Sequence, residues 1–279
     1  MTTIRQALIL AAADLTGHIA EPVRIDAEIL LGHALGWDRT ELHRRGNVEL
    51  TRSELARFQD LIDERASGRP VAHILGEWEF YGLTLSITPD VLIPRPETEQ
   101  IVDVSIERLR RSPSPRILDL GTGSGCLPIA LADQLPGARI VATDISPEAL
   151  AVAESNVKRH GFASRIELRH GDLLEAAPER FDLVVSNPPY VADGDPGLAP
   201  DVERYEPHLA LRDVRDHDGL GFYRAIAREV RSHLLTGGFV LVEVGDRQAS
   251  QVRAFFENES FVTEVHRDLA GIERIVEAR

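Results

Sequence analysis

The sequence is poor in cysteine, in basic side chains and in long apolar runs. Its 279 residues include a single cysteine, Cys126, which rules out an intramolecular disulfide framework and suits a reducing compartment. No apolar stretch approaches the length of a membrane span, and the first residues lack the charged and then apolar form of a secretory signal peptide. We therefore expect a cytoplasmic protein with no membrane partner.

Basic residues are also too few for a protein that mainly neutralises phosphates. The chain has 31 Lys and Arg against 45 Asp and Glu, a formal net charge of −14. Domains that bind nucleic acids are usually basic, so we expect no stable nucleic-acid binding; a neutral or basic protein partner suits the charge better. The histidines show no His-x-x-x-His spacing and a single cysteine cannot form Cys-x-x-Cys, so the sequence predicts no metal site.

The pattern of apolar residues changes twice along the chain. Residues 1–68 predict a small all-helical domain, with one stripe at Ile4, Leu8, Ala11 and Leu15 and another at Ile25, Ile29, Leu30 and His33. Residues 69–96 are rich in aromatic and branched residues broken by glycines and prolines, which predicts a β-hairpin and a stiff linker. Residues 97–279 alternate strands with helices, which predicts an α/β fold with a doubly wound parallel sheet.

A glycine turn follows the first strand of this last region, in the run Ile-Leu-Asp-Leu-Gly-Thr-Gly-Ser-Gly that ends at Gly125. Glycines at 121, 123 and 125 permit positive φ and let backbone N–H groups approach a ligand closely. The dinucleotide fingerprint requires glycine at position 126, where this chain has Cys126, and no Gly-Lys-Ser/Thr follows for a P-loop. The turn therefore predicts a ligand site of another kind.

Acidic residues stand at the ends of the next two strands. Asp144 is placed to accept both hydroxyls of a ribose, and Asp172 is placed to meet an adenine amino group. Each acid alone is more often a helix cap or a surface charge. Together with the glycine turn, which no basic residue lines, they indicate a nucleoside carried without a pyrophosphate. S-adenosylmethionine fits that description.

Asn187-Pro188-Pro189-Tyr190 ends the apolar strand expected at Phe181–Ser186. The prolines stop the strand and restrict the backbone before them, which leaves a polar amide fixed at the strand's carboxyl end. An amide oxygen, backbone carbonyls and a nearby aromatic ring are suited to gripping a planar NH2 group. The alternative for an isolated Asn-Pro-Pro is a rigid turn with an exposed amide.

The motifs Asp-Leu-Gly-Thr-Gly-Ser-Gly, Asp144 and Asn-Pro-Pro-Tyr resemble a class I, amino-directed methyltransferase. Four further runs resemble the release factor glutamine methyltransferases, which methylate the glutamine of the Gly-Gly-Gln motif in peptide-chain release factors. These runs are Phe-Tyr-Gly-Leu at 80–83, Val-Leu-Ile-Pro-Arg-Pro-Glu-Thr-Glu at 91–99, Asp-Val-Glu-Arg-Tyr-Glu-Pro at 201–207 and Asp-Leu-Ala-Gly-Ile-Glu-Arg at 268–274. The resemblance covers nearly the whole chain and implies a Rossmann-like, seven-stranded sheet, with release factors as partners. We expect the helical domain at residues 1–68 to recognise the substrate by binding the release-factor surface away from the glutamine.

The resemblance also implies a role for each motif position. S-adenosyl-L-methionine is the expected cofactor and S-adenosyl-L-homocysteine its product. The expected cofactor residues are Asp119, Gly121, Thr122, Gly123, Ser124 and Gly125 around the methionine part, Asp144 at the ribose, Asp172 and Leu173 at the adenine, and Asn187 at the border with the substrate. Several members carry an aromatic residue at the position of Leu173. Many have Gly-Gly after Ala-Leu, at the position of Arg212-Asp213.

Asn187 to Tyr190 are the expected substrate-binding residues, and Asn187, Pro188 and Tyr190 the catalytic ones. We expect the Asn187 side-chain oxygen and the Pro188 carbonyl to accept the two N–H bonds of the substrate amide.

Secondary candidates are Glu243, and Arg95 and Glu97 as further substrate-binding residues. Glu243 can equally be a strand-end carboxylate bonded to backbone, and Arg95 and Glu97 can pair with each other or cap the next helix. The alternative functions are methylation of a nucleic-acid amino group or of a ribosomal-protein glutamine, and cofactor binding without turnover.

Overall fold

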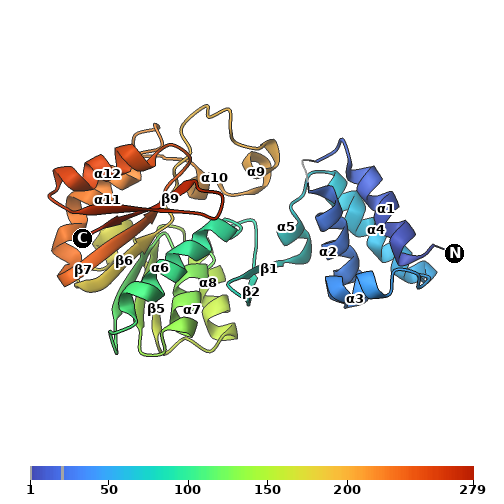
Figure 1. Ribbon diagram of the computed structural model, residues 1–279, viewed down its shortest axis with the longest axis horizontal. Coiled ribbons are helices and arrows are strands. Elements are labelled where there is room, and N and C mark those ends of the chain that lie inside the picture. The colour runs from blue at the N-terminus through green and yellow to red at the C-terminus, as the bar shows by residue number, and fades with distance from the viewer. Residues whose placement is uncertain (1, 20–21) are drawn as a thin grey trace. The chain divides into compact units, whose positions relative to one another are not determined.

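The computed structural model describes residues 2–19 and 22–279, which form two compact units (Figure 1). A helical unit comprises Met1–Glu77 and Pro200–Tyr205, and a sheet unit comprises Trp78–Ala199 and Glu206–Arg279. These bounds differ from the division at 1–68, 69–96 and 97–279 that we expected from the sequence. The segment expected as a linker is divided between the units, with residues 69–77 in the helical unit and the hairpin from Trp78 onward in the sheet unit.

The helical unit packs α1, α2 and α4 against one another. Its helices are α1 (Ile4–Leu15), α2 (Val23–Leu35), α3 (Arg39–Arg44), α4 (Arg52–Ala66), α5 (Val71–Leu75) and α9 (Pro200–Tyr205). Thr51 caps α4 in a capping box with Glu54, as the Thr-x-x-Glu spacing predicts.

The stripe predicted on α1 is buried, but the stripe predicted on α2 is correct only in part. Leu30 is buried and Ile29 is half-buried as expected, whereas Ile25 is 39% exposed, His33 is exposed, and Val23 and Ala27 face the core instead. Both sets of positions have helical spacing, and the packing against α1 and α4 selects between them.

The sheet unit is built on a seven-stranded sheet of order β5-β4-β3-β6-β7-β9-β8. Its strands are β3 (Arg116–Leu120), β4 (Arg139–Asp144), β5 (Ile166–His170), β6 (Phe181–Ser186), β7 (Leu234–Glu243), β8 (Thr263–Arg267) and β9 (Glu273–Ala278). The expected doubly wound sheet is confirmed and is mostly parallel, with β9 as the exception. β9 is antiparallel to both β7 and β8, because the short turn after Arg267 returns the chain as a hairpin.

Helices cover both faces of the sheet (Figure 1). The helices α6 (Glu99–Leu109), α7 (Cys126–Gln134) and α8 (Pro147–Arg159) lie on one face, and α11 (Gly221–Glu229) and α12 (Ala249–Asn258) lie on the other. Short elements complete the unit: α10 (His208–Leu211) and the 3-10 turns η1 (Pro96–Thr98), η2 (Leu173–Ala176) and η3 (Val230–His233). The central strands are therefore buried on both sides, which explains their near-continuous apolar sequences.

The expected hairpin is present as β1 (Glu77–Phe80) and β2 (Leu83–Ser86). Tyr81 and Gly82 form its two-residue turn, and both have positive φ (53° and 74°), as a type I′ turn requires. The strained tyrosine is held by its neighbours on α6: its backbone N–H donates to Glu99 at 2.7 Å and its hydroxyl donates to Asp103 at 2.8 Å.

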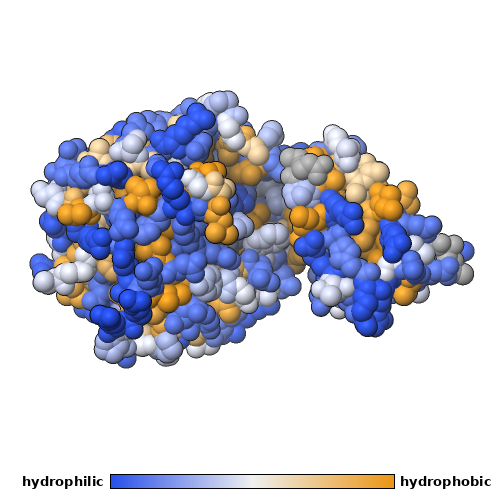
Figure 2. Space-filling model, in the orientation of Figure 1, coloured by the Kyte–Doolittle hydropathy of each residue, from blue (hydrophilic) through white to orange (hydrophobic). Residues whose placement is uncertain are grey.

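The face drawn in Figure 2 is mainly hydrophilic on each unit, with apolar side chains in small groups. Within residues 2–19 and 22–279, no helix combines the length and the apolar character needed to cross a membrane.

Candidate active site

A pocket lies at the carboxyl ends of β3, β4, β5 and β6. In a doubly wound sheet this is the edge where ligands bind, and the switch in strand order falls between β3 and β6. The pocket brings together eight of the residues expected from the sequence, which are Gly121, Gly123, Asp144, Asp172, Leu173, Asn187, Pro188 and Pro189. Its apolar walls include Ile145, Leu209 and Phe222. Leu209 comes from the long segment after Tyr190.

The glycine turn is held in place by the end of β4. The backbone N–H groups of Gly121 and Thr122 both donate to the Thr143 carbonyl at 2.9 Å, and that of Gly123 donates to Asp144 Oδ2 at 2.8 Å. Gly121 and Gly123 have φ of 73° and 55°. A Cβ atom built at either glycine would meet no atom of the described residues within 4 Å, so the turn leaves open space for a ligand beside its backbone.

The Asp144 carboxylate uses part of its hydrogen-bonding capacity to hold the backbone in place. Its second oxygen, Oδ1, accepts the backbone N–H of Ser146 at 2.9 Å. Burial raises the pKa of the Asp144 carboxyl, while these backbone donors act in the opposite direction. Each carboxylate oxygen has two acceptor positions, so Asp144 can still accept two hydroxyl groups from the pocket side.

Buried polar atoms without partners surround the glycine turn. Among the residues that the structure describes, both carboxyl oxygens of Asp119 and the hydroxyls of Thr122 and Ser124 are buried without a well-formed hydrogen bond. Burial raises the pKa of Asp119 to about 7; the nearby Thr122 hydroxyl opposes this rise, and the charge of Asp144 adds to it. An unpaired buried polar group costs roughly 1–3 kcal/mol, so these atoms favour a ligand with hydrogen-bonding groups. They flank the pocket and are not part of its lining, and neither is Gly125.

Asp172 and Leu173 lie on the pocket wall that follows β5. Both Asp172 oxygens accept hydrogen bonds from Arg215 Nη2, at 2.5 and 2.6 Å, in a pair that is about one-third exposed. Leu173 has φ of 45°, a left-handed conformation that is strained for a leucine. Its side chain packs partly against the core and contributes an apolar surface to the pocket.

Asn187 stands where β6 ends, and its amide is held on one side only. Ser186 joins the ends of β6 and β3, because its hydroxyl donates to the Leu120 carbonyl at 2.8 Å. Asn187 Nδ2 donates to Thr98 Oγ1 at 3.1 Å, whereas Asn187 Oδ1 is buried with no hydrogen-bond partner among the described residues. The amide therefore offers an unused acceptor in a side chain that lines the pocket.

Thr98 is a site residue that the sequence argument missed. Its hydroxyl donates to Glu243 Oε2 at 2.6 Å while it accepts from Asn187. Thr98 lies within the Val91–Glu99 run, which the sequence marked as characteristic, but no local pattern pointed to the residue. Glu243, one of the secondary candidates, thus binds a side-chain hydroxyl. Burial raises the pKa of Glu243 to about 7.

Tyr190 does not line the pocket with the other three residues of its motif. Its side chain packs partly against the core, and burial raises its pKa to about 12. The charges of Glu243, Arg95 and Glu97 also act on its hydroxyl, so the ring lies near the secondary candidates. Contact between this ring and a substrate stays a prediction.

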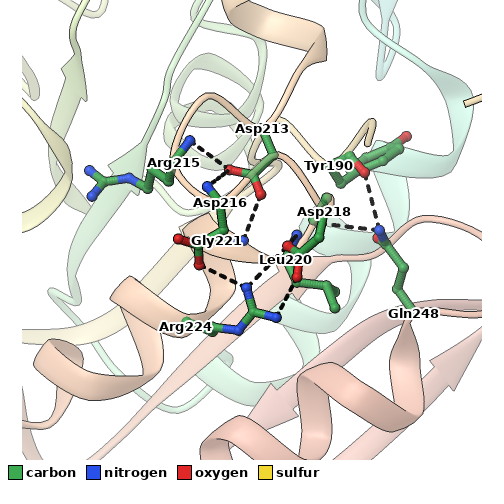
Figure 3. A network of polar contacts seen from close by, with 10 residues as sticks. Tyr190, Asp213, Arg215, Asp216, Asp218, Leu220, Gly221, Arg224 and Gln248 are labelled. Carbon is green, nitrogen blue, oxygen red and sulfur yellow. Dashed lines mark hydrogen bonds and ion pairs between the residues drawn. The ribbon is translucent and has the colours of Figure 1, made fainter. Parts of the chain in front are cut away.

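Figure 3 shows how the loop beside Tyr190 is folded. The buried Asp213 carboxylate accepts the backbone N–H of Gly221 at 2.8 Å. Gln248 Nε2 donates to the carbonyls of Tyr190 at 3.1 Å and Gly219 at 3.2 Å. A Cβ at Gly219 would lie 2.5 Å from the Tyr190 carbonyl oxygen, so glycine is required there. Asp213, at the position where the chain departs from the family pattern, therefore organises this loop.

Arg95 pairs with a residue that we did not expect. Its Nη2 lies 2.5 Å from Oε1 of the buried Glu206, whose other oxygen accepts the Ile93 N–H at 3.0 Å. The suggested pairing of Arg95 with Glu97 is therefore replaced by a bond to the Asp201–Pro207 run. Neither residue makes a side-chain cap on η1.

Three potential metal ligands, Glu264, His266 and Glu277, meet on β8 and β9. Arg108 Nη2 lies 2.8 Å from an oxygen of each carboxylate, so an arginine already supplies their counter-charge. The sequence could not reveal this group because its members come from two strands.

Comparisons with known proteins agree with the architecture. Residues 6–76 match the family model described as PrmC N-terminal domain, and residues 101–199 match the one described as Methyltransferase small domain. The chain is 42% identical to a release factor glutamine methyltransferase of Geobacter sulfurreducens, over 99% of this chain and 96% of that protein. It is 43% identical to one of Cereibacter sphaeroides, over 91% and 90%. The structure is similar to that of a ribosomal protein L11 methylase of Lactobacillus delbrueckii subsp. bulgaricus, with a TM-score of 0.50, 25% identity and coverage of 69% and 83%.

Proposed function

Because the chain belongs to the release factor glutamine methyltransferase family, an S-adenosylmethionine-dependent family, we propose that it methylates release factors in the cytoplasm. The acceptor is the side-chain amide nitrogen, N5, of the glutamine in their Gly-Gly-Gln motif. This methylation would modulate translation termination. The observation that carries the proposal is the buried, unpartnered Oδ1 of Asn187 in a pocket shared with the glycine turn and Asp144.

The residues around the pocket suit S-adenosyl-L-methionine. When bound, this group supplies an electrophilic methyl carried by a sulfonium. The unpaired oxygens of Asp119 would hold its ammonium group, and the spare acceptors of Asp144 its ribose hydroxyls. Leu173 and Phe222 offer apolar surface to its adenine, with Asp172 at the edge. Methyl transfer to the amide nitrogen would need no metal ion.

Asn187 and Pro188 would hold the substrate amide. A carboxamide nitrogen is a poor nucleophile because its lone pair is delocalised into the carbonyl. Acceptance of its two N–H bonds, by Asn187 Oδ1 and by the Pro188 carbonyl, orients the lone pair and stabilises the positive charge that develops on nitrogen. The bound cofactor would supply the methyl group, and the substrate nitrogen would release one N–H proton to solvent. Solvent would suffice as the acceptor because an N-alkylated amide cation is strongly acidic.

Positioning should contribute more than polarisation to the rate. Alignment of two bound reactants is worth roughly 7–11 kcal/mol. One preorganised polar contact to developing charge contributes about 3–4 kcal/mol, by analogy with an oxyanion-hole donor. The site therefore needs rigid acceptors more than it needs a general base with a tuned pKa.

The proposal is tested with S-adenosylmethionine carrying a labelled methyl group. The protein is incubated separately with a purified release factor, with ribosomal protein and with duplex DNA, and any label is mapped by mass spectrometry. A release factor whose Gly-Gly-Gln is changed to Gly-Gly-Ala is the matched control. Label on the glutamine that disappears in the control supports the proposal. Label confined to DNA or to ribosomal protein, or no label despite cofactor binding, contradicts it.

A further inference from the structure

The hydrogen-bond chain behind Asn187 has a direction. Thr98 is buried, and its hydroxyl lies 2.6 Å from Glu243 Oε2 and 3.1 Å from Asn187 Nδ2. A hydroxyl has one hydrogen to donate and two lone pairs with which to accept. Above the pKa of Glu243, which burial raises to about 7, its carboxylate is ionised and can only accept. The Thr98 hydrogen therefore points to Glu243, and a lone pair is left for Asn187.

This direction determines which end of the asparagine amide meets the pocket. The Asn187 amide has a donor end, Nδ2, and an acceptor end, Oδ1, and a rotation of 180° exchanges them. Only Nδ2 can satisfy the lone pair of Thr98, so Oδ1 is the end left unpaired and buried. A rotated amide would set Oδ1 against the Thr98 oxygen and present N–H groups to a substrate that itself needs acceptors.

Glu243 is held firmly enough to act as the fixed end of the chain. It closes β7, is almost completely buried, and its backbone carbonyl accepts the Tyr223 hydroxyl at 2.8 Å. Thr98 ends η1 just before α6. The hydrogen bonds therefore link Thr98 to Asn187, 89 residues away in the sequence, and to Glu243, 145 residues away.

We propose that Thr98, oriented by Glu243, is a positioning residue that keeps the Asn187 amide with its oxygen available to the substrate amide. The proposal rests on the function proposed above, because it explains how that site presents an acceptor. Thr98 touches neither the substrate nor the cofactor in this role and acts through Asn187.

The first test replaces the Thr98 hydroxyl with a methyl group. Thr98→Val keeps the shape of the side chain and removes both hydrogen bonds, so the amide is free to rotate. We expect kcat for release-factor methylation to fall roughly 10-fold, the value of one hydrogen bond, with the cofactor Kd and the release-factor KM within about 2-fold. Thr98→Ser, which restores the hydroxyl, should recover most of the loss.

Two further variants separate positioning from general stability. Ser105→Ala removes another buried hydroxyl, on α6, whose bond goes to the Ile101 carbonyl of its own helix. It should lower the melting temperature without changing kcat. In an Asn187→Ala background, Thr98→Val should cost nothing further, because no amide remains to be oriented. Additive losses in this cycle would overturn the proposal.

Nuclear magnetic resonance of the free protein gives a reading that needs no turnover. The side-chain amide signals of Asn187 are assigned by their loss in Asn187→Ala. They should shift and exchange faster with solvent in Thr98→Val, and stay unchanged in Ser105→Ala. If the wild-type protein methylates release factors and Thr98→Val neither lowers kcat nor moves these signals, the inference fails while the proposed function stands. If the wild-type protein transfers no methyl, the proposed function fails, and the signals still report whether Thr98 holds the amide.

Discussion

Replacement of Asn187 by alanine removes the acceptor on which the proposed chemistry depends. The change deletes Oδ1, which has no partner among the described residues, and Nδ2, which donates to Thr98. The free protein therefore loses one hydrogen bond, worth about 1 kcal/mol of unfolding free energy. Asn187→Ala should fold, and its melting temperature checks this first.

The effect on the reaction should be much larger than the effect on stability. Loss of one preorganised contact to developing charge costs about 3–4 kcal/mol by analogy with oxyanion-hole donors, so kcat should fall roughly 100-fold to 1,000-fold. Turnover should not vanish, because the Pro188 carbonyl and the alignment of the reactants remain. The cofactor Kd should stay nearly unchanged, because Asp144 and the glycine turn are untouched.

The assay measures these quantities separately. Titration calorimetry gives the cofactor Kd, and transfer of labelled methyl to a release factor gives kcat and KM under saturating cofactor. A fall in kcat with an unchanged cofactor Kd identifies an interaction made in the transition state. Wild-type turnover by a folded Asn187→Ala variant would refute the assignment of Asn187 as the acceptor. A fall explained wholly by weaker cofactor binding would place the residue in the cofactor site instead.

Three further predictions concern other parts of the molecule. Because burial raises the pKa of Asp119 from 3.8 to about 7, the folded protein keeps a proton that the unfolded chain loses between these values. The cofactor-free protein should thus lose on the order of 4 kcal/mol of unfolding free energy as pH rises through that window. Denaturant titrations should show that the unfolding free energy of Asp119→Asn depends less steeply on pH than that of the wild type. The same pH dependence in both proteins would contradict this prediction. Asp172→Asn should weaken cofactor binding by roughly 10-fold, about the value of one hydrogen bond, without changing kcat at saturation, and calorimetry that finds no change would remove Asp172 from the adenine site. Deletion of residues 1–67 should raise the KM for release factor more than the cofactor Kd, because the pocket residues lie between Asp90 and Phe222. Equal increases in KM and Kd would count against a substrate-binding role for the helical unit.

Local patterns predicted where the strands of the sheet lie but not the direction of β9. β6 has the expected bounds, Phe181–Ser186, because a short apolar run bounded by turn residues is a sufficient signal. The direction of β9 was wrong, because direction depends on whether a connection crosses over the sheet or turns back beside its own strand. The stripe on α2 was wrong at Ile25 and His33, because two helical registers fitted the same residues and only the neighbouring helices choose between them.

The sequence by itself determined the parts of the candidate site that are made by neighbours along the chain. The glycine turn, the strand-end acids Asp144 and Asp172, and the Asn-Pro-Pro run are local, since spacing alone places them at the carboxyl ends of strands. Tertiary structure decided which of these parts meet. It bonds the Asp144 carboxylate to the backbone of the glycine turn and buries the Asp119 oxygens without a well-formed hydrogen bond among the described residues. It also places Thr98 between Asn187 and Glu243. Those contacts depend on strand order and on helix packing, which bring together residues too distant in sequence for any local pattern to record.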